Sequence, residues 1–130
     1  MRILFLGDVV GISGCSKILN NLKAEIKKRN INFVIVNGEN SAEPGVGLTS
    51  EICNDFFNCG VNVITTGNHV WDQKEIVSFI DKENRLLRPH NLFEPSPGKG
   101  FEIYEDSNNF KIGVLNLMGN VFMKKCEDVF

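Results

Sequence analysis

The chain has 130 residues, of which 42% are hydrophobic and 23% are charged, with one Trp and four Pro. This composition excludes a disordered or collagen-like chain, and the length allows one hydrophobic core, so we expect a single domain over residues 1–130. Because the net charge is −2, the chain lacks the basic field that holds a nucleic-acid backbone, and any contact with nucleic acid must be local.

The cysteines and the N-terminal segment indicate the compartment. Cys15, Cys53, Cys59 and Cys126 show none of the spacings that are typical of zinc or redox sites. We therefore expect reduced, mostly buried thiols. The apolar run at residues 1–5 is too short for a signal peptide or a membrane span. The sequence predicts a cytoplasmic protein with no membrane partner.

The first part of the chain predicts a strand, a helix and a second strand. Residues 2–6 form a near-continuous apolar run, which predicts a parallel strand buried on both faces. Apolar residues recur at helical spacing over 18–26, and the basic residues near Arg29 suit the end of that helix. Residues 33–36 predict another buried strand, and a long loop over 37–47 follows it.

Two further helices and a third strand follow. Thr49 is a suitable N-cap for a helix that runs to about Cys59 and ends at Gly60. Residues 61–65 predict the third strand, and a helix through 75–80 comes after it. Three successive strand, loop and helix units predict a parallel sheet with right-handed crossovers.

The last third of the chain has a different character. Residues 89–98 are rich in Pro, and the segments 101–105 and 110–116 flank a turn at 106–109, which indicates a hairpin. Residues 117–130 contain no helix cap and no polar tail. We expect an α/β fold with a mostly parallel sheet, flanking helices and a C-terminal hairpin, in a chain that stops partway through a larger fold.

Polar residues follow each of the predicted parallel strands. Asp8 follows the first strand, Glu39 and Asn40 follow the second, and Asn68 and His69 follow the third. The carboxyl ends of parallel strands lie at one edge of the sheet, where α/β proteins bind their ligands. Carboxylate and carbonyl oxygens suit hard or borderline divalent cations. The sequence therefore predicts a metal site at this edge.

Each of these residues also has a structural explanation. Asp8 could cap its own loop, the asparagines could turn the backbone, and His69 could be a structural histidine. Glu39 is harder to explain in this way, because no helix solvates it and a structural role requires a specific partner.

Three other polar or aromatic residues are given structural roles. We expect Trp71 to pack against the start of the third helix and Asp72 to serve as its N-cap or first-turn acid. Arg88 could bind a substrate phosphate, but a solvated or structural ion pair is the more common role.

Six short motifs span nearly the whole chain in a characteristic order: Gly-Asp-Val-Val-Gly at 7–11, Asn-Gly-Glu-Asn at 37–40, Gly-Val-Gly-Leu-Thr at 45–49, Thr-Gly-Asn-His-Val-Trp-Asp at 66–72, Leu-Arg-Pro at 87–89 and Asn-Leu-Met-Gly at 116–119. In these motifs the sequence resembles the calcineurin-like metallophosphoesterases, and within them the bacterial YmdB-type cyclic-nucleotide phosphodiesterases. The resemblance implies the first half of a four-layer αββα sandwich.

The resemblance also implies a site and a reaction. Two divalent metals, which are Fe, Mn or Mg, would be held by Asp8, Glu39, Asn40 and Asn68. His69 would give a proton to the leaving group or stabilise the phosphoryl oxygens. The substrate would be a 2′,3′-cyclic nucleotide or another small phosphoester, with an RNA end as a further candidate.

The chain departs from the family in its histidines. The family motifs Asp-Phe-His and Gly-Thr-His-Thr-His are absent, and the one histidine besides His69 is His90, in a segment typical of a turn. Two six-coordinate ions need about ten to twelve ligand positions, more than the implied side chains fill. We therefore expect one weak metal site, uncovered apolar surface, and a complementary C-terminal half or a second copy as partner.

Three functions remain open at this point. The first is the metal-dependent phosphodiesterase that the resemblance implies, incomplete in this chain. The second is a catalytically inactive domain that binds a metal or a nucleotide. The third is a flavodoxin-like phosphate binder that uses glycines 11, 14, 45 and 47, although no P-loop or dinucleotide spacing follows any strand.

Overall fold

The structure is a computed structural model that describes residues 1–93, 95–123 and 126–127. Its centre is a four-stranded parallel sheet with the order β1-β2-β3-β4. The strands are β1 (Ile3–Leu6), β2 (Phe33–Asn37), β3 (Val63–Thr65) and β4 (Leu86–Leu87). The parallel sheet confirms the prediction. The sequence did not predict β4, because two apolar residues show no periodicity.

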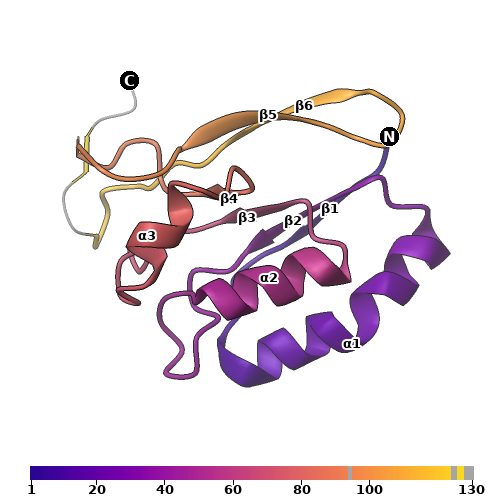
Figure 1. Ribbon diagram of the computed structural model, residues 1–130, viewed down its shortest axis with the longest axis horizontal. Coiled ribbons are helices and arrows are strands. Elements are labelled where there is room, and N and C mark those ends of the chain that lie inside the picture. Colours follow the sequence, from indigo (N-terminus) through magenta and orange to yellow (C-terminus); the bar gives the residue numbers. More distant parts are fainter. Residues whose placement is uncertain (94, 124–125, 128–130) are drawn as a thin grey trace.

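The helices pack against one face of this sheet (Figure 1). They are α1 (Gly11–Arg29), α2 (Ser50–Cys59) and α3 (Ile76–Ile80). The predicted ends of α2 are confirmed, since the Thr49 hydroxyl accepts a hydrogen bond from the Ile52 N–H and Gly60 ends the helix with a φ of 112°. A side chain at Gly60 would be strained there, because L-residues rarely adopt positive φ.

The predicted hairpin is also confirmed. It consists of β5 (Phe101–Glu105) and β6 (Lys111–Leu115), which pair antiparallel. It covers the sheet face opposite the helices (Figure 1), where Ile112 and Val114 pack against Phe33 and Val63. The described elements therefore form three layers: helices, parallel sheet and hairpin.

Burial differs between the strands. Val36, Val63 and Ile64 are fully buried, as predicted for β2 and β3. The same prediction was wrong for β1, where Ile3 and Phe5 are 45% and 59% exposed. The reason is tertiary, because β1 lies at the edge of the sheet, where neither layer covers it completely.

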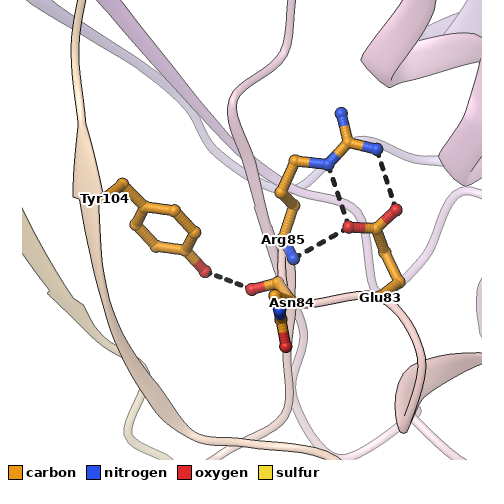
Figure 2. A network of polar contacts seen from close by, with 4 residues as sticks. All are labelled: Glu83, Asn84, Arg85 and Tyr104. Carbon is orange, nitrogen blue, oxygen red and sulfur yellow. Dashed lines mark hydrogen bonds and ion pairs between the residues drawn. The ribbon is translucent and has the colours of Figure 1, made fainter.

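A polar network fixes the hairpin to the amino ends of the strands (Figure 2). The Tyr104 hydroxyl donates to the Asn84 carbonyl at 2.6 Å. Next to it, the Arg85 guanidinium donates to both carboxylate oxygens of Glu83 and stacks over the Phe57 ring at 3.8 Å. These hydrogen bonds lower the pKa of Glu83. Burial raises the pKa of Tyr104 above its usual value, so the hydroxyl keeps its proton.

Two expectations about the chain as a whole can be compared with the structure. The four cysteines are free and buried, as predicted, and burial raises the pKa of Cys53 well above its usual value. In the part of the chain that the structure describes, no helix combines the length and the apolar character needed to cross a bilayer.

Candidate metal centre at the carboxyl ends of the strands

Backbone hydrogen bonds hold the three strand-end loops together. The Gly11 N–H donates to the Asn40 carbonyl at 2.8 Å, which joins the loop after β1 to the loop after β2. The Gly38 N–H donates to the Thr65 carbonyl at 3.0 Å, which joins the loop after β2 to the end of β3. The edge at which the sequence predicts a metal site is thus a set of neighbouring loops.

Asp8 occupies the turn that leaves β1. Its φ of 47° lies in the left-handed region, where a residue other than glycine is uncommon. Asp8 is exposed, and its Oδ1 accepts a hydrogen bond from Asn40 Nδ2 at 2.8 Å. The structure therefore brings together two of the predicted ligands, from the ends of β1 and β2. Backbone strain of this kind persists where the surroundings enforce it, and it concentrates at functional sites.

Glu39 lies against Gly67, in the loop after β3. A Cβ atom at Gly67 would be only 2.1 Å from Glu39 Oε2, so glycine is required for the carboxylate to lie there. Glu39 Oε2 and Asn40 Oδ1 are both buried without a hydrogen-bond partner. Burying an unpaired carboxylate or amide oxygen costs free energy that a cation would offset. The donors present therefore fit a divalent cation.

The predicted catalytic histidine is held by a carboxylate. His69 Nδ1 lies 2.6 Å from Asp72 Oδ2, and both side chains are partly exposed. The prediction that Asp72 caps the third helix was wrong, because α3 begins at Ile76 with Glu75 in the cap position. The signal in the sequence was the spacing of three residues between His69 and Asp72, which allows a contact within one turn.

Asn68 lies in the sequence between Gly67, which contacts Glu39, and His69, which contacts Asp72. It is half-buried and lies in the same loop as Gly67 and His69. Its neighbour Gly67 contacts the Glu39 carboxylate. The structure therefore places Asn68 in the loop that lies against Glu39, and its role as a ligand stays a prediction.

Asn116 is a supporting residue whose role the sequence did not reveal. Its buried side chain donates to the Thr66 carbonyl at 2.8 Å and to the Leu87 carbonyl at 3.1 Å. Thr66 directly precedes the loop that carries Gly67 and His69. The end of the hairpin thus fixes the start of this loop, a long-range contact that no local pattern indicates.

The structure also gives the surroundings of the other residues singled out in the sequence. Arg88 is 4% exposed and donates to the carbonyls of Pro89 and Pro97. Its burial shows that the expectation of a solvated arginine was wrong, whereas the structural ion pair stays a prediction. Trp71 packs against the core cluster that includes Ile76 and Ile80 of α3, and its contact with the start of that helix stays a prediction. His90 lies in a turn, also as expected.

The donor set is small for two metal ions. Among the residues that the structure describes, no group of three or more His, Cys, Asp or Glu side chains could hold an ion. The candidate site instead combines the carboxylates of Asp8 and Glu39 with amide groups. Such a set is rich in oxygen and poor in charge, a composition that binds a hard cation weakly.

The layered fold matches that of two solved structures. A hypothetical protein from Thermus thermophilus superposes with a TM-score of 0.88 at 34% identity, over 98% of this chain and 49% of that one. A crystal structure of a novel phosphatase from Mycoplasma pneumoniae superposes with a TM-score of 0.87 at 34% identity, over 99% of this chain and 47% of that one.

The sequence defines the family within this fold class. Residues 4–130 match the YmdB-like protein family, and the chain belongs to it. The chain is 43% identical over 130 residues to the 2′,3′-cyclic-nucleotide 2′-phosphodiesterase of Bacillus subtilis. That alignment covers all of this chain and 48% of the Bacillus protein, so the chain spans about half the length of this relative.

Proposed function

We propose that this chain is the first half of a metal-dependent phosphodiesterase that hydrolyses 2′,3′-cyclic nucleotides or related phosphoesters, RNA ends among them. The buried, unpartnered oxygens of Glu39 and Asn40 beside Asp8 carry this proposal. The activity named for the Bacillus relative supports the substrate class.

Asp8, Glu39, Asn40 and Asn68 would hold the cations, for which Fe, Mn or Mg suit the oxygen ligands. Divalent cations supply positive charge opposite the entering and departing oxygens of a phosphoester and lower the pKa of water. The strained turn at Asp8 and the packing of Glu39 against Gly67 keep the two carboxylates oriented before a ligand arrives. Such preorganisation reduces the cost of ordering the site.

His69 would provide the proton for the leaving oxygen. Asp72 holds Nδ1 of its ring, which favours the tautomer with the proton on Nδ1 and fixes the ring plane. When Nε2 also carries a proton, it is the atom that gives this proton to the leaving oxygen, and the neutral ring with its proton on Nδ1 remains. Asp72 is thus a positioning residue for His69.

The proposed enzyme is incomplete in this chain. Two carboxylates do not balance the charge of two dications, and few donors other than amides are available. We propose that a second polypeptide segment supplies further ligands. The same shortage of donors favours one alternative, a catalytically inactive domain that binds a single cation or a nucleotide.

The flavodoxin-like alternative lacks support. Such folds bind phosphate where the strand order reverses next to the first strand. In the described residues the order is β1-β2-β3-β4, with β1 at the edge and no reversal. The free, buried thiols suit a reducing compartment, so we retain the cytoplasm as the proposed location.

Reconstitution tests the proposed activity. We expect this chain, refolded with the second half of the Bacillus relative and Mn²⁺, to hydrolyse 2′,3′-cyclic AMP. Asp8→Ala should lower turnover at least about 100-fold, because it removes one of two carboxylates from the cation site. Asp55→Ala, at an exposed position on α2, is the matched control and should keep the activity.

Two results would contradict this proposal. The first is equal turnover of the Asp8→Ala and Asp55→Ala proteins. The second is a complete lack of turnover in a reconstituted complex that binds Mn²⁺, which would favour the inactive binding domain. Calorimetry with Mn²⁺ on this chain alone should show one weak site that Asp8→Ala removes.

A further inference from the structure

The segment between β3 and α3 carries both His69 and Asp72, and residues 66–75 form turns rather than a helix or a strand. Two local backbone hydrogen bonds, each 3.2 Å long, join the Val70 N–H to the Gly67 carbonyl and the Asp72 N–H to the His69 carbonyl. Connecting segments are more mobile than the helices and strands that they join. Contacts from elsewhere in the chain are therefore needed to keep the two side chains in place.

The loop of residues 45–49 provides such contacts. Gln73 Nε2 donates to the Val46 carbonyl at 3.2 Å, a hydrogen bond between positions 27 apart in the sequence. Gly47 lies against the same turn, since a Cβ atom there would be 3.3 Å from Asp72 Cβ and from the Gln73 backbone nitrogen. Its φ of 82° favours glycine as well. The loop thus packs directly on the backbone that carries Asp72.

The same loop is fixed to the segment that carries Asn40. The Ala42 N–H donates to the Gly47 carbonyl at 3.0 Å, and the Gly45 N–H donates to the Ala42 carbonyl at 2.8 Å. Ala42 is 2% exposed and follows Asn40 by two residues. The loop therefore connects the candidate cation ligands after β2 with the turn that carries Asp72.

We propose that Gln73 is a positioning residue for His69. By binding the Val46 carbonyl, Gln73 holds Asp72, and through Asp72 the His69 ring, in a fixed place relative to the candidate cation ligands. The role rests on the proposed function, in which His69 gives a proton to the leaving oxygen. A misplacement of about 1 Å can lower the rate of such a step about 100-fold. An uncharged amide suits this position, because a cationic donor would compete with His69 for the Asp72 carboxylate.

Nitrogen-15 NMR of the His69 ring tests the positioning without any turnover. His90 is the other histidine of the chain, and His90→Gln, at an exposed turn position, leaves the His69 signal alone in the spectrum. In this background we expect the neutral ring to carry its proton mainly on Nδ1, because that atom lies 2.6 Å from Asp72 Oδ2.

Gln73→Met removes the N–H donor and keeps an unbranched side chain of similar length against Gly47. We expect the share of the Nδ1–H tautomer to fall at least about twofold, because the turn can take other conformations once this hydrogen bond is lost. Lys74→Met, the same replacement at the exposed neighbouring position, is the matched control and should leave the share unchanged.

Kinetics of the reconstituted complex test whether the positioning serves proton transfer. For 2′,3′-cyclic AMP, Gln73→Met should lower kcat at least about fivefold, with KM and Mn²⁺ affinity changed less than about twofold. The leaving group of bis(4-nitrophenyl) phosphate departs without a proton, so kcat for this substrate should change less than about twofold. Lys74→Met should match the wild type with both substrates.

The proposal is overturned if the His69 tautomer is the same in Gln73→Met and Lys74→Met. It is also overturned if Gln73→Met lowers turnover of both substrates equally, as a merely structural role would. If the complex hydrolyses neither substrate, the proposed function fails, whereas the spectra still decide whether Gln73 holds His69. Gln73→Glu, which also lacks the N–H donor, gives the same test if the methionine variant does not fold.

Discussion

Carboxylate side chains at the two ends of the central sheet differ in whether their oxygens have hydrogen-bond partners. At the amino ends, both oxygens of Glu83 accept hydrogen bonds from Arg85, at 2.9 and 2.8 Å (Figure 2). At the carboxyl ends, Glu39 lies against Gly67 with Oε2 buried and unpartnered. At the amino end, the carboxylate therefore finds its hydrogen-bond partners within the chain, and the network stabilises the fold. The carboxyl end leaves polar atoms unsatisfied, which is expected where a ligand completes the structure.

Among the polar contacts, the largest effect on folding is expected at the amino ends of the strands. Arg85→Ala removes two charge-assisted hydrogen bonds and the stacking over Phe57, and it leaves Glu83 Oε1 with the backbone N–H of residue 85 at 3.0 Å. We expect the free energy of unfolding to fall by about 2 kcal/mol, measured by urea denaturation. Lys82→Ala, at an exposed position nearby, should change it by less than about 0.5 kcal/mol. Equal values for the two variants would contradict the structural role of the network.

A methyl group at Gly67 should separate ligand binding from stability. In Gly67→Ala the new Cβ would displace the tip of the Glu39 side chain, which can rotate away. We expect Mn²⁺ affinity to fall at least tenfold, about 1.4 kcal/mol, with less than about 1 kcal/mol lost from the free energy of unfolding.

Gly100→Ala is the steric comparison for Gly67→Ala. Its Cβ would lie 2.2 Å from the His90 Cα, and backbone cannot rotate away. We expect a loss of at least about 2 kcal/mol in the free energy of unfolding. Unchanged Mn²⁺ binding in Gly67→Ala, measured by calorimetry, would show that the position of Glu39 does not matter for the cation.

The stability of the fold should depend on pH through the ionisation of Glu83. Its pKa is lowered in the folded chain, chiefly by the hydrogen bonds from Arg85. The ion pair therefore contributes fully above the ordinary glutamate pKa of about 4.3. The contribution is lost as the pH falls through the lower folded value. Between pH 7 and pH 3 we expect the wild type to lose about 1 kcal/mol more than Glu83→Gln.

Urea unfolding across this range measures the difference, and Glu43→Gln, at an exposed loop position, serves as the control. That variant should follow the wild type. If Glu83→Gln loses as much unfolding free energy on acidification as the wild type, the ion pair adds no stability.

The smallest effect is expected at Glu39. A neutral amide costs less to bury than an unpaired carboxylate. In the presence of a chelator, Glu39→Gln should therefore leave the free energy of unfolding unchanged or raise it by up to about 1 kcal/mol, while Mn²⁺ binding weakens. A fall of more than about 1 kcal/mol in the free energy of unfolding would show that the carboxylate has a structural role. The contrast between the two ends of the sheet would then be lost.

Much of the candidate site could be anticipated because a parallel sheet brings the carboxyl ends of its strands together. The contact between Asp8 and Asn40 follows from that rule. The partner of Asp72 and the burial of Arg88 did not follow from any such rule. Each depends on where a loop places a side chain, and the same sequence spacing is compatible with several placements.

The sequence by itself determined the strands β1, β2 and β3, the hairpin, and the caps of α2. Apolar periodicity, the Thr49 hydroxyl and the freedom of Gly60 act over a few residues and need no distant partner. Only the tertiary structure decided which strand became the edge and which oxygens were left unsatisfied. The exposure of Phe5 and the packing of Glu39 against Gly67 depend on segments far apart in the chain. Local patterns carry no information about such contacts, because burial is a property of the whole assembly of elements.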